Sequence, residues 1–354
     1  MKRIIHPIGQ GALYSEQFDN FIIVYDCGEW KKSKSAQQFV EKSFSSISTI
    51  DVLFISHFDF DHVSLIPTLK QNRKIKICVL PVLNDVEKII LYNIYMALNK
   101  KDVAALVMNP KSFFGAATKI VYVKFADTYI AEKNDNTITE TIIEDLNDGD
   151  QIPSGTELKL SEVDWIYVPY NIEHKERFNE LITILKNQNL IIAELMIEYN
   201  EYIEKHIKEI RKAYKLLHGG INSNSMYLYS GPRKDELRML SSIQFCKKKY
   251  GIKDYCSGCV YTGDGNLDVI KRIYQQYWND IGTIQLPHHG SDKNYDFNFP
   301  EKQDKKLLFF ASFGNNNSYG HPSEDVIYDI NNKRYLFFPV SETKATRLIC
   351  QCLN

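Results

Sequence analysis

Four potential metal ligands lie within six consecutive positions, directly after an apolar segment. They are His57, Asp59, Asp61 and His62. The apolar residues before them, 51–56, are predicted to form a buried strand, and the chain leaving its end can turn all four side chains into one cavity. Imidazole and carboxylate groups together suit zinc, manganese or iron. A metal site is therefore the simplest explanation of this segment.

Three later segments also carry an aspartate or a histidine just after a predicted strand. Asp264 follows one strand and precedes a predicted helix, a position from which one carboxylate can bridge two cations. The adjacent pair His288 and His289 follows the next strand, and His321 follows a third. Each signal is modest alone, but together they place several more ligands at strand ends.

These side chains require a framework that brings distant strand ends together. Short apolar runs bounded by Gly and Asn predict antiparallel strands in the first thirty residues, and strands alternate with helices further on. Further strands are predicted at 75–80, 119–125, 163–168, 260–262, 281–286, 306–312 and 334–340, and helices at 36–44, 65–70, 84–98, 267–278 and 323–331. Interleaved strands and helices indicate an α/β layered fold.

Two segments interrupt this alternation. Residues 173–218 carry apolar side chains at helical spacing and are predicted to form an inserted helical pair, which either packs on the core or acts as a lid or docking surface. Residues 230–254 are predicted to form a second, basic insertion. The simplest organisation is a single domain over residues 1–354.

The charge distribution is uneven, although the formal net charge is only −1. The segment from Lys205 to Lys253 contains twelve Lys or Arg residues and three acidic residues. A solvated helix face explains some of this excess. A basic patch beside the active site would instead attract phosphates, and the sequence leaves both interpretations open.

Composition excludes several classes of protein. Apolar residues make up 44% of the chain and charged residues 25%, and no tract resembles a long linker. The longest apolar runs are far shorter than the roughly 20 residues of a membrane helix, so no bilayer span is expected. No signal peptide is evident, which favours the cytoplasm.

The seven cysteines are scattered and odd in number, unlike a secreted disulfide framework. Cys256 and Cys259 have the spacing of half a zinc site or of a redox dithiol. Only Cys350 and Cys352 could supply the other half, and their spacing is unusual. Ordinary thiols are therefore preferred.

Several motifs in a fixed order resemble the metallo-β-lactamase superfamily, and in particular the hydrolase domain of ComEC-type competence proteins. They are His57-Phe-Asp59-Phe-Asp61-His62, Thr262-Gly-Asp264, Pro287-His-His-Gly-Ser291 and Tyr319-Gly-His321-Pro322, with weaker matches at 8–11, 25–28, 146–150 and 224–228. The resemblance covers nearly the whole chain except the helical insertion and the basic stretch. It implies a four-layered αβ/βα metallo-β-lactamase sandwich with the metals at one edge of the two sheets.

The resemblance also implies roles for the ligand residues. His57 and Asp59 would hold the first of two divalent metal ions, and Asp61 and His62 the second. Asp264 would bridge them. Either His288 or His289 would complete the second site. His288 is favoured as the ligand, with His289 nearer the substrate, but adjacent histidines cannot be separated by sequence alone.

Two departures from the superfamily pattern affect the first metal. Asp59 stands where many members have histidine, so manganese becomes an alternative to zinc, the metal otherwise expected. The middle-chain histidine that many members use as a further ligand is not evident. His174 is the only candidate near the right strand, and it lies in the predicted helical insertion. The first metal would then be weakly held or completed by water.

The predicted activity is hydrolysis of a phosphodiester by a water that two divalent metal ions activate. Asp61 and Asp264 would orient this water. His289 or His321 would stabilise developing charge or protonate the leaving group, although His321 could equally be structural. The resemblance implies a nuclease acting on DNA or another nucleic acid. The alternative substrate is a small phosphodiester such as a cyclic nucleotide or a phosphocholine ester.

A function of a different class is a binding or regulatory module, in which the metals are structural and the helical insertion at 173–218 docks a protein partner. A third possibility combines the two: an effector enzyme held inactive by a partner. Changing Asp61 to Ala would leave the cellular phenotype intact only for the binding module.

Overall fold

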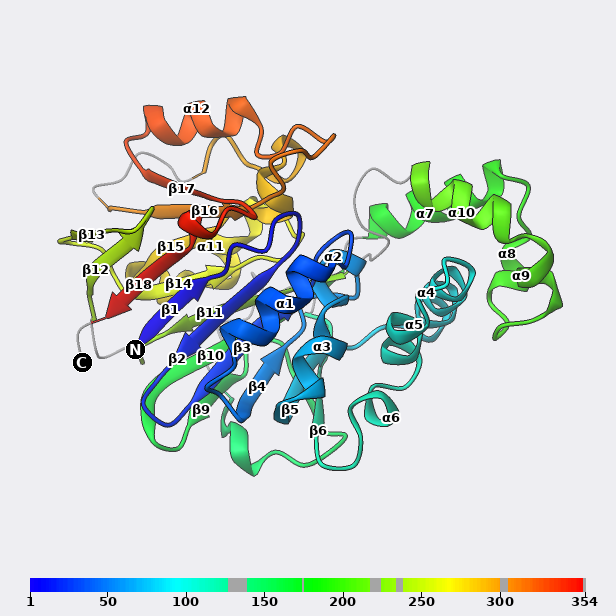
Figure 1. The fold of residues 1–354 in the computed structure, drawn as a ribbon, viewed down its shortest axis with the longest axis horizontal. Helices are drawn as coiled ribbons and strands as arrows, with labels where there is room; N and C mark the ends of the chain where they lie inside the picture. Colours follow the sequence, from blue (N-terminus) through cyan, green and yellow to red (C-terminus); the bar gives the residue numbers. More distant parts are fainter. Residues whose placement is uncertain (127–138, 174, 217–223, 234–237, 300–304, 353–354) are drawn as a thin grey trace.

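Two large β-sheets face each other in the computed structural model, with helices on their outer faces (Figure 1). The structure describes all residues except 127–138, 174, 217–223, 234–237, 300–304 and 353–354. Among the described residues, one sheet has ten strands and the other eight.

The larger sheet combines both ends of the chain with its first half. Its strand order is β13 (Lys248–Gly251), β12 (Leu240–Phe245), β18 (Leu348–Cys352), β1 (Lys2–Ile5), β2 (Leu13–Gln17), β3 (Ile22–Cys27), β4 (Thr49–Phe54), β5 (Lys74–Pro81), β6 (Lys119–Val123) and β8 (Gln151–Ile152). Strands β1 to β3 pair antiparallel, as expected for the first thirty residues, and β3 to β6 pair parallel.

The smaller sheet contains the second half of the chain. Its order is β17 (Leu336–Val340), β16 (Leu308–Ser312), β15 (Ile281–Gln285), β14 (Gly258–Tyr261), β11 (Asn224–Gly231), β10 (Val163–Glu173), β9 (Glu157–Leu160) and β7 (Glu140–Ile142). Strands β14 to β17 pair parallel, so their carboxyl ends lie at the same edge.

The helices fall into three groups along the chain. The first is α1 (Lys34–Ser43), α2 (Phe60–Val63), α3 (Ile66–Gln71), α4 (Asp85–Ala97), α5 (Lys101–Met108) and α6 (Pro110–Phe114). The second is α7 (Lys175–Asn187), α8 (Ile192–Leu195), α9 (Glu201–Lys205) and α10 (Ile207–Leu216). The third is α11 (Ile270–Ile273) and α12 (Glu324–Asn332), with the 3-10 turns η2 (Leu267–Val269), η3 (Gln275–Asp280), η4 (Pro287–Gly290) and η5 (Asp292–Asn294).

Three buried apolar clusters separate four layers. The first lies between the larger sheet and the helices α1, α3, α4 and α5, the second lies between the sheets, and the third lies between the smaller sheet and the helices α11 and α12. Strand β4 shows how one strand serves two clusters: Leu53 faces the first and Phe54 the second, because neighbouring side chains point to opposite faces. The expected αβ/βα layered arrangement is confirmed.

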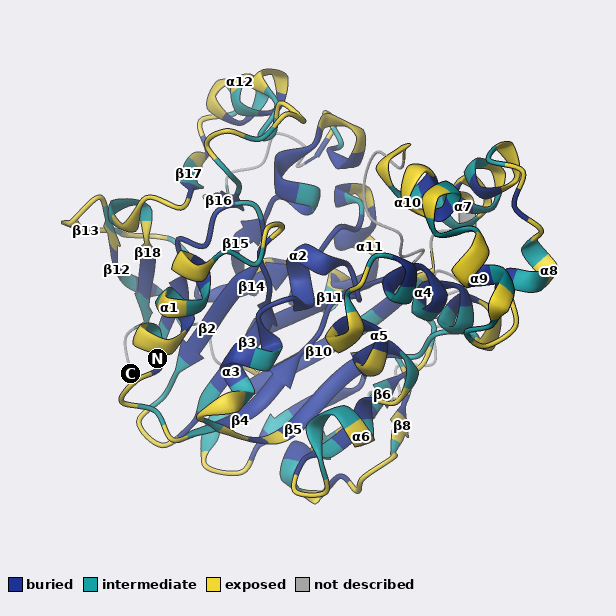
Figure 2. Cartoon of the chain, turned by 45° about the vertical axis from the view of Figure 1, so that its right-hand side comes forward, coloured by how far each residue is buried: buried dark blue, intermediate teal, exposed yellow. Residues whose placement is uncertain are grey.

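The helices α7 to α10 form an arm on the side of α4 and α5 (Figures 1 and 2). Three hydrogen bonds from two side chains join it to α4. Asn93 of α4 donates from Nδ2 to the carbonyls of Leu195 and Ile197, at 3.0 and 2.7 Å, and Arg211 of α10 donates to the carbonyl of Ala97 at 2.8 Å. The sequence predicts a helical pair in this segment, whereas the structure has two longer helices joined by two short ones.

The basic stretch at 230–254 supplies β12 and β13, a hairpin at the free edge of the larger sheet. β12 pairs with β18, so this stretch extends the sheet. The seven cysteines are all free thiols. In the described part of the chain, no helix is long and apolar enough to cross a membrane.

Candidate metal centre

The predicted ligands converge where strands of both sheets end. His57 and Asp59 follow β4, Asp61 and His62 lie in the short helix α2, and Asp264 follows β14. His288 and His289 lie in η4, after β15. His321 lies between β16 and α12. Elements more than 200 positions apart in the chain thus meet at one edge of the sandwich.

The first group of ligand atoms comes from His57, His62 and Asp264, all buried. The Nε2 atom of His57 lies 3.6 Å from Oδ2 of Asp264, and Nε2 of His62 lies 3.2 Å from Oδ1 of Asp264. Asp59 adds a carboxylate oxygen 3.4 Å from Nε2 of His57. Nitrogen and oxygen ligand atoms from four side chains are therefore gathered in one place.

The second group comes from Asp61, His62 and His289. The Nε2 atom of His289 lies 3.0 Å from Oδ2 of Asp61. His62 belongs to both groups, so the two groups adjoin.

The structure separates the adjacent histidines. His289 joins Asp61 and His62, whereas His288 points its Nε2 atom toward Asp264 at 3.8 Å and places Nδ1 3.2 Å from Oδ1 of Asn294. The sequence favours His288 as the ligand of this group, but the geometry brings His289 there instead. His321 is not in either group, and its ring centroid lies 5.6 Å from that of His288. His174 lies outside the described residues.

Two residues beside the centre fix the tautomers of His57 and His62. Asp26 accepts hydrogen bonds from the backbone N–H of Ser56 at 2.7 Å and from its hydroxyl at 2.6 Å. Because the Ser56 hydroxyl donates to Asp26, it accepts from Nδ1 of His57, 2.8 Å away. Nδ1 of His62 donates to Asp26 at 2.8 Å. Both rings therefore present an Nε2 lone pair to the centre when they are neutral.

A hydrogen bond to a backbone carbonyl fixes the tautomer of His289 in the same way. Its Nδ1 lies 2.7 Å from the carbonyl of Ser312, which can only accept a hydrogen bond. Nε2 of the neutral ring therefore carries a lone pair, and it faces a carboxylate oxygen of Asp61. Two acceptors this close require a positive charge between them, either a proton or a metal ion.

The geometry of these groups fits a divalent metal ion. Ligand atoms around a tetrahedral site with bonds of about 2.0–2.2 Å lie roughly 3.3–3.6 Å apart, close to the separations around Asp264. In the described part of the chain, Nε2 of His57, Nε2 of His62 and Oδ1 of Asp264 are buried without a hydrogen-bond partner. Buried polar atoms are rarely left in this state, and a bound divalent metal ion would satisfy all three.

The electrostatics of the centre also favour positive charge. Burial and the neighbouring His62 lower the pKa of His57, but Asp264 and Asp59 outweigh them and raise it to about 9. Burial likewise opposes charge on His62, yet the carboxylates of Asp264 and Asp26 hold its pKa well above the ordinary value. The carboxylates thus create a space in which a cation is stabilised.

Two glycines allow neighbouring loops to approach the ligand segment. A Cβ atom on Gly28 would lie 2.4 Å from the carbonyl carbon of Asp61, and one on Gly11 would lie 2.9 Å from the Asp61 oxygen. The same Asp61 oxygen accepts a hydrogen bond from the N–H of Ala12 at 3.1 Å. These contacts give a physical reason for the glycines in the two early motifs.

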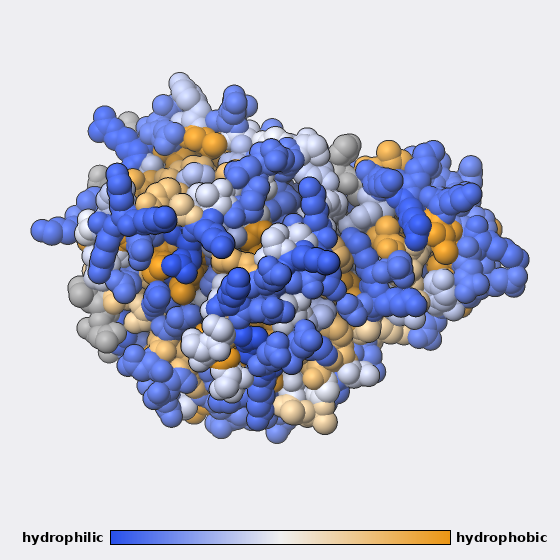
Figure 3. All heavy atoms as spheres, viewed as in Figure 1, coloured by the Kyte–Doolittle hydropathy of each residue, from blue (hydrophilic) through white to orange (hydrophobic). Residues whose placement is uncertain are grey.

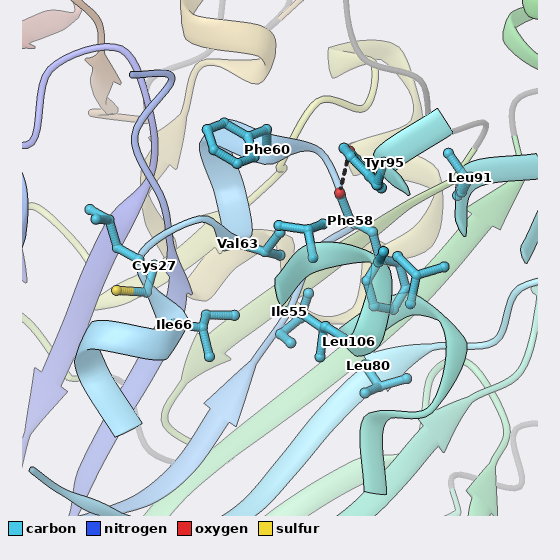
Figure 4. Packing of buried hydrophobic residues seen from close by; sticks show 14 of the residues in the cluster. Cys27, Ile55, Phe58, Phe60, Val63, Ile66, Leu80, Leu91, Tyr95 and Leu106 are labelled. Carbon is cyan, nitrogen blue, oxygen red and sulfur yellow. Dashed lines mark hydrogen bonds between the residues drawn. The ribbon is translucent and has the colours of Figure 1, made fainter. Parts of the chain in front are cut away.

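On its other side the ligand segment is held by the apolar core (Figure 4). The hydroxyl of Tyr95 in α4 donates to the carbonyl of Phe58 at 2.7 Å, and the side chain of Phe58 is buried. The segment is therefore fixed between the early loops and α4.

The backbone of the histidine pair is unusual. His288 and His289 have φ values of 48° and 58°, in the left-handed region that non-glycine residues seldom adopt. The N–H of His288 donates to the carbonyl of Gly263 at 3.1 Å, next to Asp264. This local strain aims the two rings in different directions, which sequence spacing cannot reveal.

A cleft of about 540 Å³ opens over the centre. Its lining combines ligand residues with aromatic and basic side chains: Gln10, Trp30, Asp59, Asp61, Tyr214, Lys215, Asp264, His288, His289, Ser291, Asp292, Lys293, Ser318, Tyr319 and His321. The site is thus reachable by a ligand.

The basic segment found in the sequence is divided in the structure. Lys215 of α10 lines the cleft, whereas Lys248 and Lys249 lie in β13, at the far edge of the larger sheet from β4. Among the described basic residues of this segment, Lys215 in its first part lines the cleft.

Three residues beside the centre were not identified from the sequence. Asp26 lies within the weaker motif at 25–28 and Ser56 directly precedes the motif that begins at His57, and these positions were the only available signal. Arg177 of α7 donates from Nη2 to the carbonyl of Asp264 at 2.6 Å, and no local pattern indicates that contact.

Comparisons with known proteins give little further information. No family model matches the chain, and no curated protein matches it significantly in sequence. Among solved structures, human tRNase Z, short form, is similar with a TM-score of 0.36 and 10% identity, covering 80% of this chain and 77% of that one. Similarity at this level says nothing by itself about activity.

Proposed function

We propose that this protein is a metal-dependent phosphodiesterase of the metallo-β-lactamase superfamily that cleaves nucleic acid. One observation carries the proposal: the Nε2 lone pairs of His57, His62 and His289 all face carboxylate oxygens beneath an open cleft. Such an arrangement is typical of a dinuclear metal centre. The order of sequence motifs supports the assignment to the superfamily, including its ComEC-like members.

Two divalent metal ions, when bound, supply an activated water and neutralise charge on a phosphate. His57, Asp59 and Asp264 would hold the first, and Asp61, His62 and His289 the second, with Asp264 shared. Zinc is the expected metal because the set contains three imidazoles, and the three carboxylates make manganese the alternative.

The chain's own groups bind and orient the substrate. Lys215 and Lys293 line the cleft and attract phosphate oxygens. Arg177 fixes the backbone of Asp264 and has a buried Nη1 atom with no hydrogen-bond partner among the described residues. His288 and His321 line the same cleft. Because Nδ1 of His288 donates to Oδ1 of Asn294, the neutral His288 ring has an Nε2 lone pair and cannot donate from that atom. We therefore propose His321 as the donor to the leaving group.

Nucleic acid is preferred over a small diester because the cleft is basic beyond its ligand residues and contains aromatic side chains. A cyclic nucleotide or phosphocholine ester is the alternative substrate. The free cysteines support a cytoplasmic location.

The decisive experiment measures cleavage of a mixed panel with zinc or manganese. The panel contains single- and double-stranded DNA, RNA, cyclic nucleotides and bis-p-nitrophenyl phosphate. The proposal requires metal-dependent turnover that is lost in the Asp61→Ala/Asp264→Ala double variant and kept in Asp325→Ala, an exposed control in α12. A protein that holds two metals and cuts no diester would contradict it.

A partner-regulated enzyme is the second candidate, and the surface of the arm favours it. Hydrophilic side chains cover most of the face in Figure 3, but apolar ones also reach the surface on the arm. Ile191, Met196 and Ile197 are each exposed, by 56%, 38% and 53%. Replacing all three by serine would change the cellular phenotype without changing diester hydrolysis in vitro if a partner docks there. An unchanged phenotype would remove this candidate.

A further inference from the structure

We infer that the substrate is a single-stranded nucleic acid, and that Trp30 and Tyr319 stack on one of its bases beside the metal centre. The inference rests on the proposed phosphodiesterase function and names its substrate class. It is carried by an aromatic wall and by a second cavity behind it.

The wall contains three aromatic side chains from separate parts of the chain. The Trp30 ring is parallel to that of Tyr214, with centroids 6.2 Å apart and an interplanar angle of 9°. It meets the Tyr319 ring nearly at a right angle, with centroids 6.3 Å apart. Lys100 holds its Nζ atom 5.7 Å from the Trp30 centroid, a cation–π contact that steadies the indole.

A second cavity, also of about 540 Å³, adjoins this wall. Both cavities are lined by Gln10, Trp30, Ser318 and Tyr319. Trp30 is 37% exposed and Tyr319 43%, although large aromatic side chains are usually covered. The two rings therefore offer free aromatic surface next to the metal centre.

The two cavities differ in charge. Beyond its metal-binding groups, the cavity over the centre has Lys215 and Lys293 against a single acid, Asp292. The second cavity has equal numbers of acids and lysines. The first is suited to phosphate, and the second has no charge excess that would attract one.

Uncharged polar and aromatic groups also line the second cavity, beside apolar residues such as Ile8 and Ala36. Its lining includes Ser33, Ser35, Asn316, Asn317 and the ring of Phe39. Hydroxyl and amide groups can pair with the edges of a base while aromatic rings cover its faces. A nucleobase combines these requirements.

This arrangement favours a single strand. A phosphate at the metals and a neighbouring base on the wall require that base to leave its own stack. Within a duplex the base must first be unpaired and unstacked, whereas a single strand presents its bases freely.

Tryptophan fluorescence tests the stacking without any turnover. The chain has three tryptophans, and Trp165 and Trp278 are only 1% and 9% exposed. Titration with a ten-residue oligothymidylate in EDTA should quench the wild type and Trp278→Phe, but not Trp30→Phe. A ten-base-pair duplex should quench much less. Equal quenching of Trp30→Phe and wild type, or equal quenching by duplex and single strand, would overturn the inference.

A substrate lacking one base provides the second test. The ratio of kcat/KM for an intact oligonucleotide to that for one with an abasic site next to the cleaved phosphate should fall roughly 10-fold in Trp30→Ala or Tyr319→Ala. Tyr328→Ala, which removes a 69% exposed tyrosine from α12, should keep the wild-type ratio. An unchanged ratio in both wall variants overturns the inference. Failure of the wild type to cut any diester refutes the proposed function, while the fluorescence titration still decides the stacking.

Discussion

Two clusters of buried polar side chains in the described part of the molecule differ in how fully their members satisfy one another by hydrogen bonds. One surrounds Arg3 and Glu16, between the sheets, and the other is the candidate metal centre. Both contain carboxylates and cations or potential cations that are almost wholly buried. Only the metal centre leaves its central atoms without hydrogen-bond partners among the described residues.

The Arg3 and Glu16 cluster is closed. Arg3 donates to Glu16 at 2.7 Å and to the carbonyls of Ser257 and Ser230. Glu16 also accepts from the hydroxyls of Tyr167, Ser230 and Tyr261, at 2.7, 2.6 and 2.9 Å. A buried pair satisfied in this way needs no further ligand, which indicates a structural role.

The candidate metal centre is not satisfied internally, because its hydrogen-bond acceptors face one another and no donor from the described residues lies between them. The difference shows that burial and charge alone do not mark a functional site. What distinguishes it is a set of oriented groups that only an added cation can satisfy. The following predictions separate the two clusters, since changes in one should affect activity and changes in the other stability.

The largest effect is expected for Asp264→Asn, which removes the carboxylate shared by both ligand groups. Activity on a phosphodiester should fall by roughly 10³-fold or more, because metal-dependent stabilisation of the transition state is lost. Zinc at 100 times its dissociation constant should stabilise the wild type by about 2.7 kcal/mol and leave the variant nearly unchanged. Thermal unfolding with and without zinc measures this. A variant as strongly stabilised as the wild type would show that Asp264 is no ligand.

Arg3→Met should instead destabilise the fold by about 3–5 kcal/mol, because it leaves the buried Glu16 carboxylate without its cation. Denaturant unfolding measures the loss. The double variant Arg3→Met/Glu16→Gln should recover much of it, because both charges are then gone. Equal stability of the single and double variants would mean that the pair is not coupled.

Asp26→Asn should have an intermediate effect on the metal centre. An amide binds Nδ1 of His62 and the Ser56 hydroxyl less strongly than a carboxylate, so both imidazoles are oriented less well. Metal affinity or activity should fall by about 10–100-fold while the fold is retained. Isothermal titration with zinc gives the affinity, and circular dichroism gives the fold. Unchanged affinity would assign Asp26 a purely structural role.

The smallest effect concerns His6, a third buried polar group, whose Nε2 lies 2.8 Å from the Ser15 hydroxyl. Burial lowers its pKa from 6.5 to about 3, so the folded state excludes a proton that the unfolded chain binds below pH 6.5. Its contribution is complete above pH 6.5 and declines as the pH falls toward 3. Between pH 6.5 and 5 the loss should be about 1.5 kcal/mol. Comparing the pH dependence of the unfolding free energy of His6→Phe with that of wild type isolates the contribution of His6. Parallel curves for the two proteins would disprove the prediction.

The sequence predicted the parts of this site that depend on local order. Apolar runs gave most of the strands, and the polar residues after them lie together because parallel strands end at the same edge. The difference between His288 and His289 could not be predicted, because it arises from two consecutive left-handed φ values. The role of Asp26 was also missed, since it depends on a hydrogen bond spanning 36 positions.

A helix predicted away from the site also shows that local sequence does not determine the whole structure. The helix predicted at 267–278 is not continuous: only α11 is α-helical, and it lies between the 3-10 helices η2 and η3. The apolar residues of this segment are buried in the third cluster, where Tyr274 and Tyr277 are fully covered. Tertiary packing here overrides the local period.

The pairing of β1 with β18 has a consequence for synthesis on the ribosome. β1 lies far ahead of β18 in the chain, yet one of its edges is covered by β18, where Lys2 pairs with Gln351. Until β18 has been synthesised, that edge of β1 is exposed to other chains. The larger sheet therefore cannot be completed before β18 has been made, and its closure depends on pairing between residues that lie far apart in the chain.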